Sequence, residues 1–140
     1  MTKFSEFDHQ CMQLAIAQAE LAYQQQEVPV GAVLTYQGEI IAAAYNQPIG
    51  LLDPTAHAEI NVLRQAAQRL QNYRLTESTL YVTLEPCLMC SGAITHARVK
   101  RVVYAAPDER KMLNHVAQYE QGLLREESGL LLRTFFQERR

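Results

Sequence analysis

The chain of 140 residues has the length of a single domain, and 48% of its residues are apolar, which is enough to bury a core. This composition excludes a disordered or collagen-like chain, three cysteines are too few for a disulfide scaffold, and no apolar run approaches the ~18 residues of a membrane span. The net charge of −2 is unevenly spread: residues 98–140 carry nine Lys and Arg against six Asp and Glu, which predicts a modestly basic rim. We expect one soluble, cytoplasmic domain over residues 1–140.

The first predicted element is a helix that opens at a capping-box pattern, Ser5–Asp8, and ends at Val28–Pro29. Its apolar spacing predicts a buried side made of Cys11, Leu14, Ala15, Gln18, Leu21 and Ala22. Two strands are expected next, at 30–35 and 39–44, around a Gln37–Gly38 turn. The chain is therefore expected to begin with a helix and a hairpin.

A loop and a second helix follow the hairpin. The stretch Asn46–Thr55 contains two prolines and a glycine, which predicts a loop. The helix is expected from about Ala56 to Leu70, with an inward face made of Ile60, Leu63, Ala67 and Leu70. Val62 and Ala66 lie off this stripe and are expected to form a second contact, suited to a partner chain.

The second half of the chain alternates strands with helices. A buried strand at 79–84 stops at Pro86, a short helix covers 87–97, and a strand at 101–106 is closed by Pro107. A weak edge strand is expected at 116–119, and a last helix from Gly122 to about Gln137, which carries Leu123, Leu124, Leu130, Leu131, Phe135 and Phe136. This order predicts an α/β fold with a mixed central sheet of about five strands covered by helices.

Two junctions that lead into helices hold the residues that indicate chemistry, Thr55–Glu59 and Glu85–Cys90. Cys87 and Cys90 form a Cys-x-x-Cys clamp at a helix N-terminus, which favours the thiolate form that binds metals. Zinc accepts two thiolates and an imidazole, so His57 is the third candidate ligand. The fourth position then stays open to water, as in catalytic rather than structural zinc sites.

Glu59 stands two residues after His57, and residues two apart do not share a helix face. Glu59 is therefore expected to approach water at the metal as a proton carrier without binding the metal itself. Cys-x-x-Cys alone is also compatible with a redox motif, a structural zinc site or buried residues, and Cys11 is expected to be a core residue. His-x-Glu combined with Pro-Cys-x-x-Cys, however, is the signature of zinc nucleobase deaminases.

Six further stretches carry a family resemblance: Glu27–Val33, Tyr45–Gly50, Asp53–Ile60, Asn72–Leu75, Leu80–Cys90 and the helix with Phe135–Phe136. They resemble the bacterial tRNA-specific adenosine deaminases, within the cytidine deaminase-like superfamily. The likeness runs from the first helix to about Asp108 and returns from about Asn114. It implies a three-layer cytidine deaminase-like fold and a homodimer that converts adenosine to inosine at the wobble position of a tRNA anticodon.

The resemblance also implies a role for each candidate site residue. One Zn²⁺ per chain would be held by His57, Cys87 and Cys90, and Glu59 would shuttle protons. Asn46 and the backbone of Ala58 would hydrogen-bond the base. The walls of the pocket for a flipped base would be Val28, Pro29, Pro48 and Leu84. The implied partners are the tRNA anticodon stem-loop and a second copy of the chain, with no membrane.

The chain departs from the family pattern at two places. Asp108–Asn114 is distinctly shorter than the family's Lys-Thr-Gly-rich loop and the segment that follows it. At Arg139–Arg140, the family's usual longer basic tail is missing. Both regions lie on the nucleic-acid side in the family. The leading hypothesis is a tRNA adenosine deaminase; the alternatives are a deaminase of a free base or nucleoside, such as guanine, cytosine or a related pyrimidine, and a non-catalytic zinc-binding subunit. Five basic residues are candidates for phosphate contacts, and the alternative for each is an ordinary solvated surface position: Arg98, Lys100, Arg101, Arg110 and Lys111.

Overall fold

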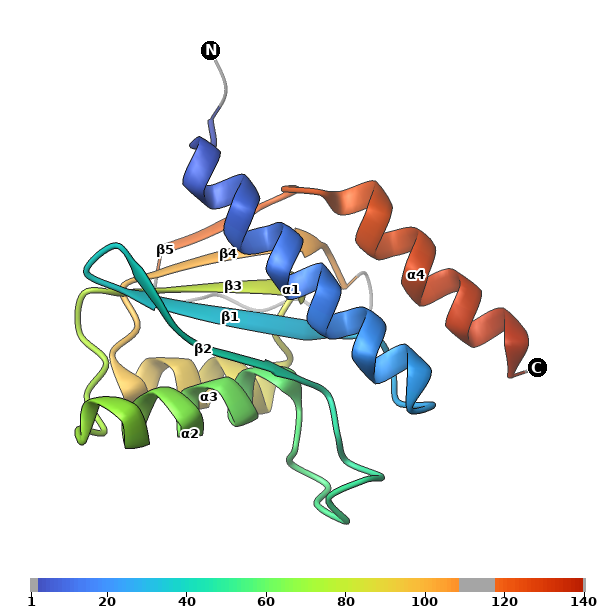
Figure 1. The fold of residues 1–140 in the computed structure, drawn as a ribbon, viewed down its shortest axis with the longest axis horizontal. Helices are drawn as coiled ribbons and strands as arrows, with labels where there is room; N and C mark the ends of the chain where they lie inside the picture. Colours follow the sequence, from blue (N-terminus) through green and yellow to red (C-terminus); the bar gives the residue numbers. More distant parts are fainter. Residues whose placement is uncertain (1–2, 109–117, 140) are drawn as a thin grey trace.

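The computed structural model describes residues 3–108 and 118–139, which form a mixed sheet with helices (Figure 1). In chain order the elements are α1 (Glu6–Gln24), β1 (Gly31–Tyr36), β2 (Glu39–Tyr45), α2 (Ala58–Leu70), β3 (Ser78–Leu84), α3 (Leu88–Ala97), β4 (Arg101–Ala106), β5 (Gln118–Gln121) and α4 (Arg125–Glu138). The strand order is β2-β1-β3-β4-β5. β1 is antiparallel to β2 and β3, whereas β3, β4 and β5 are parallel, so the predicted mixed five-stranded sheet is confirmed.

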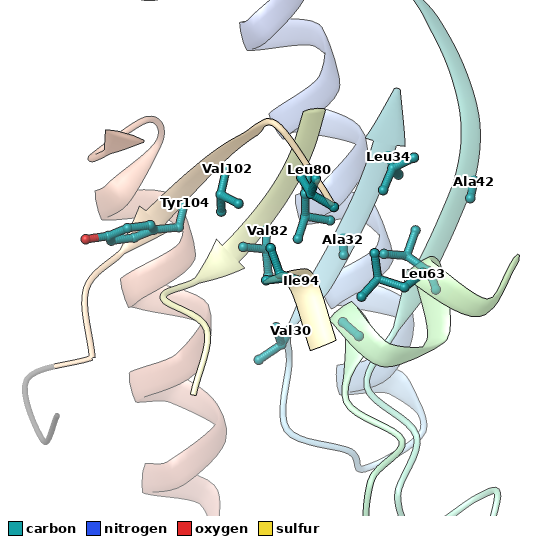
Figure 2. Packing of buried hydrophobic residues seen from close by; sticks show 14 of the residues in the cluster. Val30, Ala32, Leu34, Ala42, Leu63, Leu80, Val82, Ile94, Val102 and Tyr104 are labelled. Atoms are coloured by element: carbon teal, nitrogen blue, oxygen red, sulfur yellow. The ribbon is translucent and has the colours of Figure 1, made fainter. Parts of the chain in front are cut away.

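The helices cover both faces of the sheet and make three layers. Helices α2 and α3 lie on one face, and α1 and α4 lie on the other (Figure 1). Successive strand side chains alternate between the two layers. Leu34, Leu80 and Val102 pack toward Leu63 of α2 and Ile94 of α3, as Figure 2 shows. The neighbouring strand positions form a second core cluster against α1, which contains Val33, Tyr81 and Val103.

Helix α1 begins where the sequence predicts and ends earlier. The Ser5 hydroxyl accepts a hydrogen bond from the backbone N–H of Asp8, and the Asp8 carboxylate accepts one from the N–H of Ser5, both at 3.0 Å. The last helical residue is Gln24, and Gln26 takes a left-handed φ of 63°. The N–H of Glu27 then bonds the carbonyl of Ala22 at 2.9 Å, which closes the helix in a Schellman turn before Val28–Pro29.

The buried side of α1 differs from the predicted side. Leu14 and Leu21 are exposed, and the positions buried instead include Met12 and Ala19. The helix crosses β1 at Gly31, where a Cβ atom would stand only 2.0 Å from the carbonyl oxygen of Ala15. Because the two backbones approach so closely at this crossing, the helix needs small residues there, Ala15 and Ala19.

The buried face of α2 also differs from the predicted one. Val62 and Ala66 are fully buried in the core, so the expectation that they form a second contact surface is wrong. Ile60 and Leu70 are only half-buried. The buried stripe instead continues from Glu59, a position that its charge excluded from an apolar pattern.

The C-terminal elements overlap their predicted places. Strand β5 spans Gln118–Gln121 and includes residues 118–119 of the predicted strand, while residues 116–117 lie outside the described residues. Helix α4 begins at Arg125, because Gly122 and Leu124 have left-handed φ values. Its buried residues are Ser128, Leu132 and Phe135, whereas Leu130 and Phe136 are exposed. No helix within the described ranges is long and apolar enough to cross a membrane.

Candidate active site

The three candidate metal ligands lie at the N-termini of two neighbouring helices. His57 is the N-cap residue of α2 and Cys87 is the N-cap residue of α3, and both have extended backbones with no side-chain capping hydrogen bond. Cys90 lies one turn into α3 and is fully buried. Since Cys87 follows the end of β3 by three residues, the sheet places all three side chains at the carboxyl ends of its parallel strands, where ligands usually bind in α/β folds.

The spacing of the three side chains fits a zinc ion. The His57 Nδ1 atom lies 3.6 Å from the Cys87 Sγ and 3.5 Å from the Cys90 Sγ, and all three donor atoms lie within 4.8 Å of one another. Tetrahedral zinc with Zn–N of about 2.05 Å and Zn–S of about 2.3 Å would place its nitrogen and sulfur ligands about 3.6 Å apart. Two sulfurs and one imidazole are also the donors that zinc prefers.

The protonation chemistry of this group also fits a metal site. Burial lowers the pKa of His57, so its imidazole is neutral at pH 7 and can donate a lone pair. Burial, followed by the neighbouring charge of Glu59, raises the pKa of the Cys90 thiol far above its usual value. This sulfur therefore becomes a thiolate only when a cation replaces its proton, which is how a zinc ion binds.

A pocket of about 290 Å³ opens beside these ligands. Glu59 lines it and is only 4% exposed, so its side chain is shielded from bulk water beside the candidate ligands. Three other predicted substrate residues also line it: Val28, Asn46 and Leu84. The remaining three do not line it: Ala58 and Pro29 are buried, and Pro48 is half-buried in the following loop.

The pocket also contains residues that the sequence did not assign to it. These are Val30, Glu85, Asp108 and Phe136. A Glu85 carboxylate oxygen accepts a hydrogen bond from the backbone N–H of Asp108 at 3.0 Å, so it holds the end of β4 instead of capping α3. Phe136 comes from α4, far along the chain, and no spacing pattern connects it with the metal motifs.

Tyr104, near the site, and the basic residues considered for phosphate contact have structural roles where the structure describes them. Tyr104 is buried in the core, and its ring meets that of Tyr119 edge-on with centroids 6.4 Å apart. Arg101 forms ion pairs with Asp8 and Glu120, so its guanidinium is used within the fold and not for phosphate binding. Lys100 pairs with Glu77 at 3.0 Å, and Arg98 donates to the Thr95 carbonyl. Arg110 and Lys111 lie outside the described residues. Cys11 is a buried core residue, as expected.

The cytidine and deoxycytidylate deaminase zinc-binding region matches residues 5–106 of this chain. Together with the three-layer fold and the His57, Cys87 and Cys90 group, this match defines a zinc-dependent deaminase. The tRNA-specific adenosine deaminase of Haemophilus influenzae is 47% identical over 97% of this chain and 87% of that protein. The chain belongs to the family of tRNA-specific adenosine deaminases.

Two solved structures of deaminases have a similar fold. A tRNA:A34 deaminase studied for A-to-I editing at the wobble position of transfer RNA is 40% identical, covers 88% of this chain and 99% of that chain, and superposes with a TM-score of 0.84. A guanine deaminase from Bacillus subtilis is 38% identical, covers 76% of this chain and 66% of that chain, and gives a TM-score of 0.68. The fold is therefore shared by deaminases that act on different substrates.

Proposed function

We propose that this enzyme deaminates adenosine to inosine at the wobble position of a tRNA anticodon. The observation that carries the proposal is the pocket in which Glu59 and Asn46 lie beside the candidate zinc ligands. It is supported by relatives named as tRNA-specific adenosine deaminases, whose likeness extends over almost the whole chain. The enzyme is proposed to act as one domain over residues 1–140, in the cytoplasm.

In this proposal His57, Cys87 and Cys90 hold one zinc ion per chain. When bound, zinc lowers the pKa of a water at its open position toward ~7 and so supplies hydroxide at neutral pH. The chain contributes the neutral imidazole and two sulfurs that hold the ion, and α2 and α3 fix their directions. The overall reaction replaces the C6 amino group of adenine with the oxygen of water and releases ammonia.

Glu59 is proposed to move the protons. A carboxylate can take a proton from the attacking water, deliver it to the ring nitrogen N1, and then carry a proton to the departing amine. Its burial keeps bulk water from competing for these protons. Its place in the first turn of α2, two residues after His57, brings it near the metal ligands on a different face of the helix.

The rest of the pocket is proposed to bind the flipped base. Asn46 and the backbone of Ala58 hydrogen-bond its edge, and Val28 and Leu84 provide apolar walls, to which the structure adds Val30 and Phe136. Pro29 and Pro48 stiffen the two wall segments, because proline fixes the backbone φ. The proposed partners are the tRNA anticodon stem-loop and a second copy of the chain in a homodimer.

A deaminase of a free base is the second candidate. Two observations favour it: the short Asp108–Asn114 segment, which removes part of the family's nucleic-acid side, and the likeness to a guanine deaminase. The pocket itself does not separate the two substrates, since both present a ring with an exocyclic amine. The two candidates differ in whether flanking nucleotides are needed for binding.

The test measures ammonia release by zinc-loaded enzyme from an anticodon stem-loop with adenosine at the wobble position. The same stem-loop with guanosine there, free adenosine, guanine and cytosine serve as comparison substrates. We expect activity on the adenosine stem-loop and weak or no activity on the free compounds, because neighbouring phosphates add to binding. Replacing Arg110 and Lys111 with alanine should weaken stem-loop binding and its salt dependence. Rapid deamination of a free base with an unreacted stem-loop would establish the second candidate instead.

A further inference from the structure

Glu27 is a buried carboxylate with an unusual pair of partners. Glu27 is only 2% exposed and lies at the end of the turn that closes α1. One carboxylate oxygen accepts a hydrogen bond from the backbone N–H of Gly50 at 2.7 Å, and the other accepts one from the N–H of Ile49 at 3.2 Å. No lysine or arginine within the described ranges forms an ion pair with it, so its charge is balanced by backbone amides.

The segment that Glu27 binds has no strand or helix to hold it. Residues 46–57 connect β2 to α2 and contain only turns. At the base of this segment, the Asn61 amide donates to the carbonyls of Tyr45 and Ala56, at 2.9 and 3.2 Å. These bonds fix the two ends of the loop, whereas Glu27 holds its middle.

Glu27 also stands immediately before a segment that lines the active-site pocket. Val28 and Val30, which line the pocket, follow it in the chain. Asn46, which opens the loop and also lines the pocket, donates its backbone N–H to the carbonyl of Val30 at 3.0 Å. One carboxylate therefore connects a wall segment to the loop that carries the proposed base-binding amide.

We propose that Glu27 is a positioning residue for substrate binding, which holds the loop of residues 46–53 against the 28–30 segment and so fixes the orientation of Asn46. A charged acceptor is suited to this task, because two amide N–H groups bind a carboxylate more strongly than a neutral oxygen. The inference rests on the proposed function, since it assigns Glu27 an effect on the same pocket. It does not place Glu27 in contact with substrate.

The first arm of the test compares Glu27→Gln with wild type and with Glu39→Gln, an exposed control on β2. A glutamine offers one acceptor and presents an N–H₂ group to the second amide, so at least one of the two bonds is lost. On the adenosine stem-loop we expect KM to rise roughly tenfold, with kcat changed less than about threefold and the zinc content unchanged. Glu39→Gln should match wild type in all three measurements.

The second arm needs no substrate. Hydrogen exchange of the zinc-loaded protein should show faster exchange in Glu27→Gln at the amides of Ile49 and Gly50, with unchanged exchange in α1 and β3. Gly50→Ala perturbs the same contact while keeping Glu27, because the added Cβ would stand 3.3 Å from the Glu27 carboxylate. We expect the same changes, smaller in size, and this variant serves if Glu27→Gln does not fold.

The third arm places Glu27→Gln in an Asn46→Ala background. If Glu27 acts through Asn46, Glu27→Gln should lower kcat/KM of the Asn46→Ala enzyme by less than about threefold. This is well below the effect of Glu27→Gln on the wild-type enzyme. Wild-type KM and wild-type exchange at Ile49 and Gly50 in Glu27→Gln would overturn the proposal, and so would fully additive losses. Wild-type enzyme that leaves the stem-loop unreacted would overturn the proposed function instead, while the exchange arm would still measure the loop contact.

Discussion

The N-cap positions of α2 and α3 hold His57 and Cys87, where helix stability alone favours Ser, Thr, Asp or Asn. Neither side chain satisfies the free N–H groups of its helix. An uncapped helix start typically costs about 1 kcal/mol. The two positions are therefore explained by metal binding and not by the needs of the helices.

The metal assignment predicts different outcomes for two buried cysteines. Cys90→Ala should lose most of the zinc and the stability that the metal contributes, because one thiolate ligand is gone. Cys11→Ala, also in the core, should keep one zinc per chain and lose about 1 kcal/mol of unfolding free energy. Metal analysis and thermal unfolding of both variants check this. Equal zinc content in the two variants would show that Cys90 is not a ligand.

Glu59→Ala should separate catalysis from structure. We expect the variant to keep its zinc and its fold but to lose activity by about 10²–10⁴-fold, since the proton carrier is removed while the ligands remain. The measurements are ammonia release, zinc content and circular dichroism, with the exposed Glu39→Ala as a control. Activity near the wild-type level would assign the proton transfer to another group.

Sequence alone could place the metal centre but only part of the pocket. His57, Cys87 and Cys90 stand in short motifs whose spacing is dictated by zinc geometry, so their convergence was predictable. Val30 and Phe136 contribute only bulk and position, and Phe136 reaches the pocket from the last helix. Such a residue becomes visible only when the packing of α4 on the sheet is known.

At the scale of elements, one polar cluster joins α1, β3, β4 and β5. The buried Asp8 carboxylate accepts hydrogen bonds from the Tyr81 hydroxyl at 2.6 Å and from two Arg101 nitrogens at 3.0 and 2.9 Å. Arg101 in turn binds Glu120 on β5. β5 is an edge strand of four residues, so its backbone pairs with one neighbouring strand only. The link through Arg101 to the start of α1 is therefore expected to help hold β5 on the sheet.

The cluster predicts acid sensitivity. Burial raises the pKa of Asp8, but the hydrogen bonds from Arg101, Tyr81 and Ser5 outweigh burial and hold this pKa well below its ordinary value of 3.8. The ionised carboxylate therefore stabilises the fold fully at a pH above that ordinary value, and the contribution is lost as the pH falls toward the folded pKa.

Asp8→Asn should accordingly lower the unfolding free energy by about 2–3 kcal/mol at pH 7. The difference from wild type should stay constant down to about pH 5 and shrink below about pH 4. Urea unfolding at several pH values measures it, and comparing two proteins cancels the zinc release that acid causes in both. Glu6→Gln, an exposed change in the same helix, is the control. A difference that persists unchanged at pH 3 would contradict the ion-pair explanation.

The order and type of the elements could also be predicted, while the faces of the helices could not. Strands and turns follow local signals, such as the Gln37–Gly38 turn, where both residues have positive φ. The buried side of α1 depends instead on Gly31, a residue of another element that admits the helix backbone. Hydrophobic spacing carries no information on such close approach, so it predicts that Leu14 and Leu21 are buried, although both are exposed.

At the scale of the whole molecule, apolar side chains remain exposed on and beside α2 and α3 although Val62 and Ala66 are buried. Tyr73 and Leu88 are 74% and 72% exposed, and a shallow cavity of about 340 Å³ lies between the two helices. Its lining includes Ile60, Ala67 and Ala93. Exposed apolar surface of this kind favours association, and two-fold pairs are the commonest arrangement of identical chains.

The proposed homodimer is therefore expected to use this face. Sedimentation at micromolar concentration should give a species of about twice the chain mass of 15.9 kDa. Tyr73→Glu should raise the dimer dissociation constant by roughly tenfold or more, because a charge would be buried in an apolar contact. It should leave the unfolding free energy of the monomer nearly unchanged, since Tyr73 is largely exposed in the single chain. Leu130→Glu, a change at a 60% exposed residue on α4 across the sheet, should leave the dimer intact. A wild-type monomer would contradict the homodimer. Dissociation by Leu130→Glu alone would move the interface to the α1–α4 face.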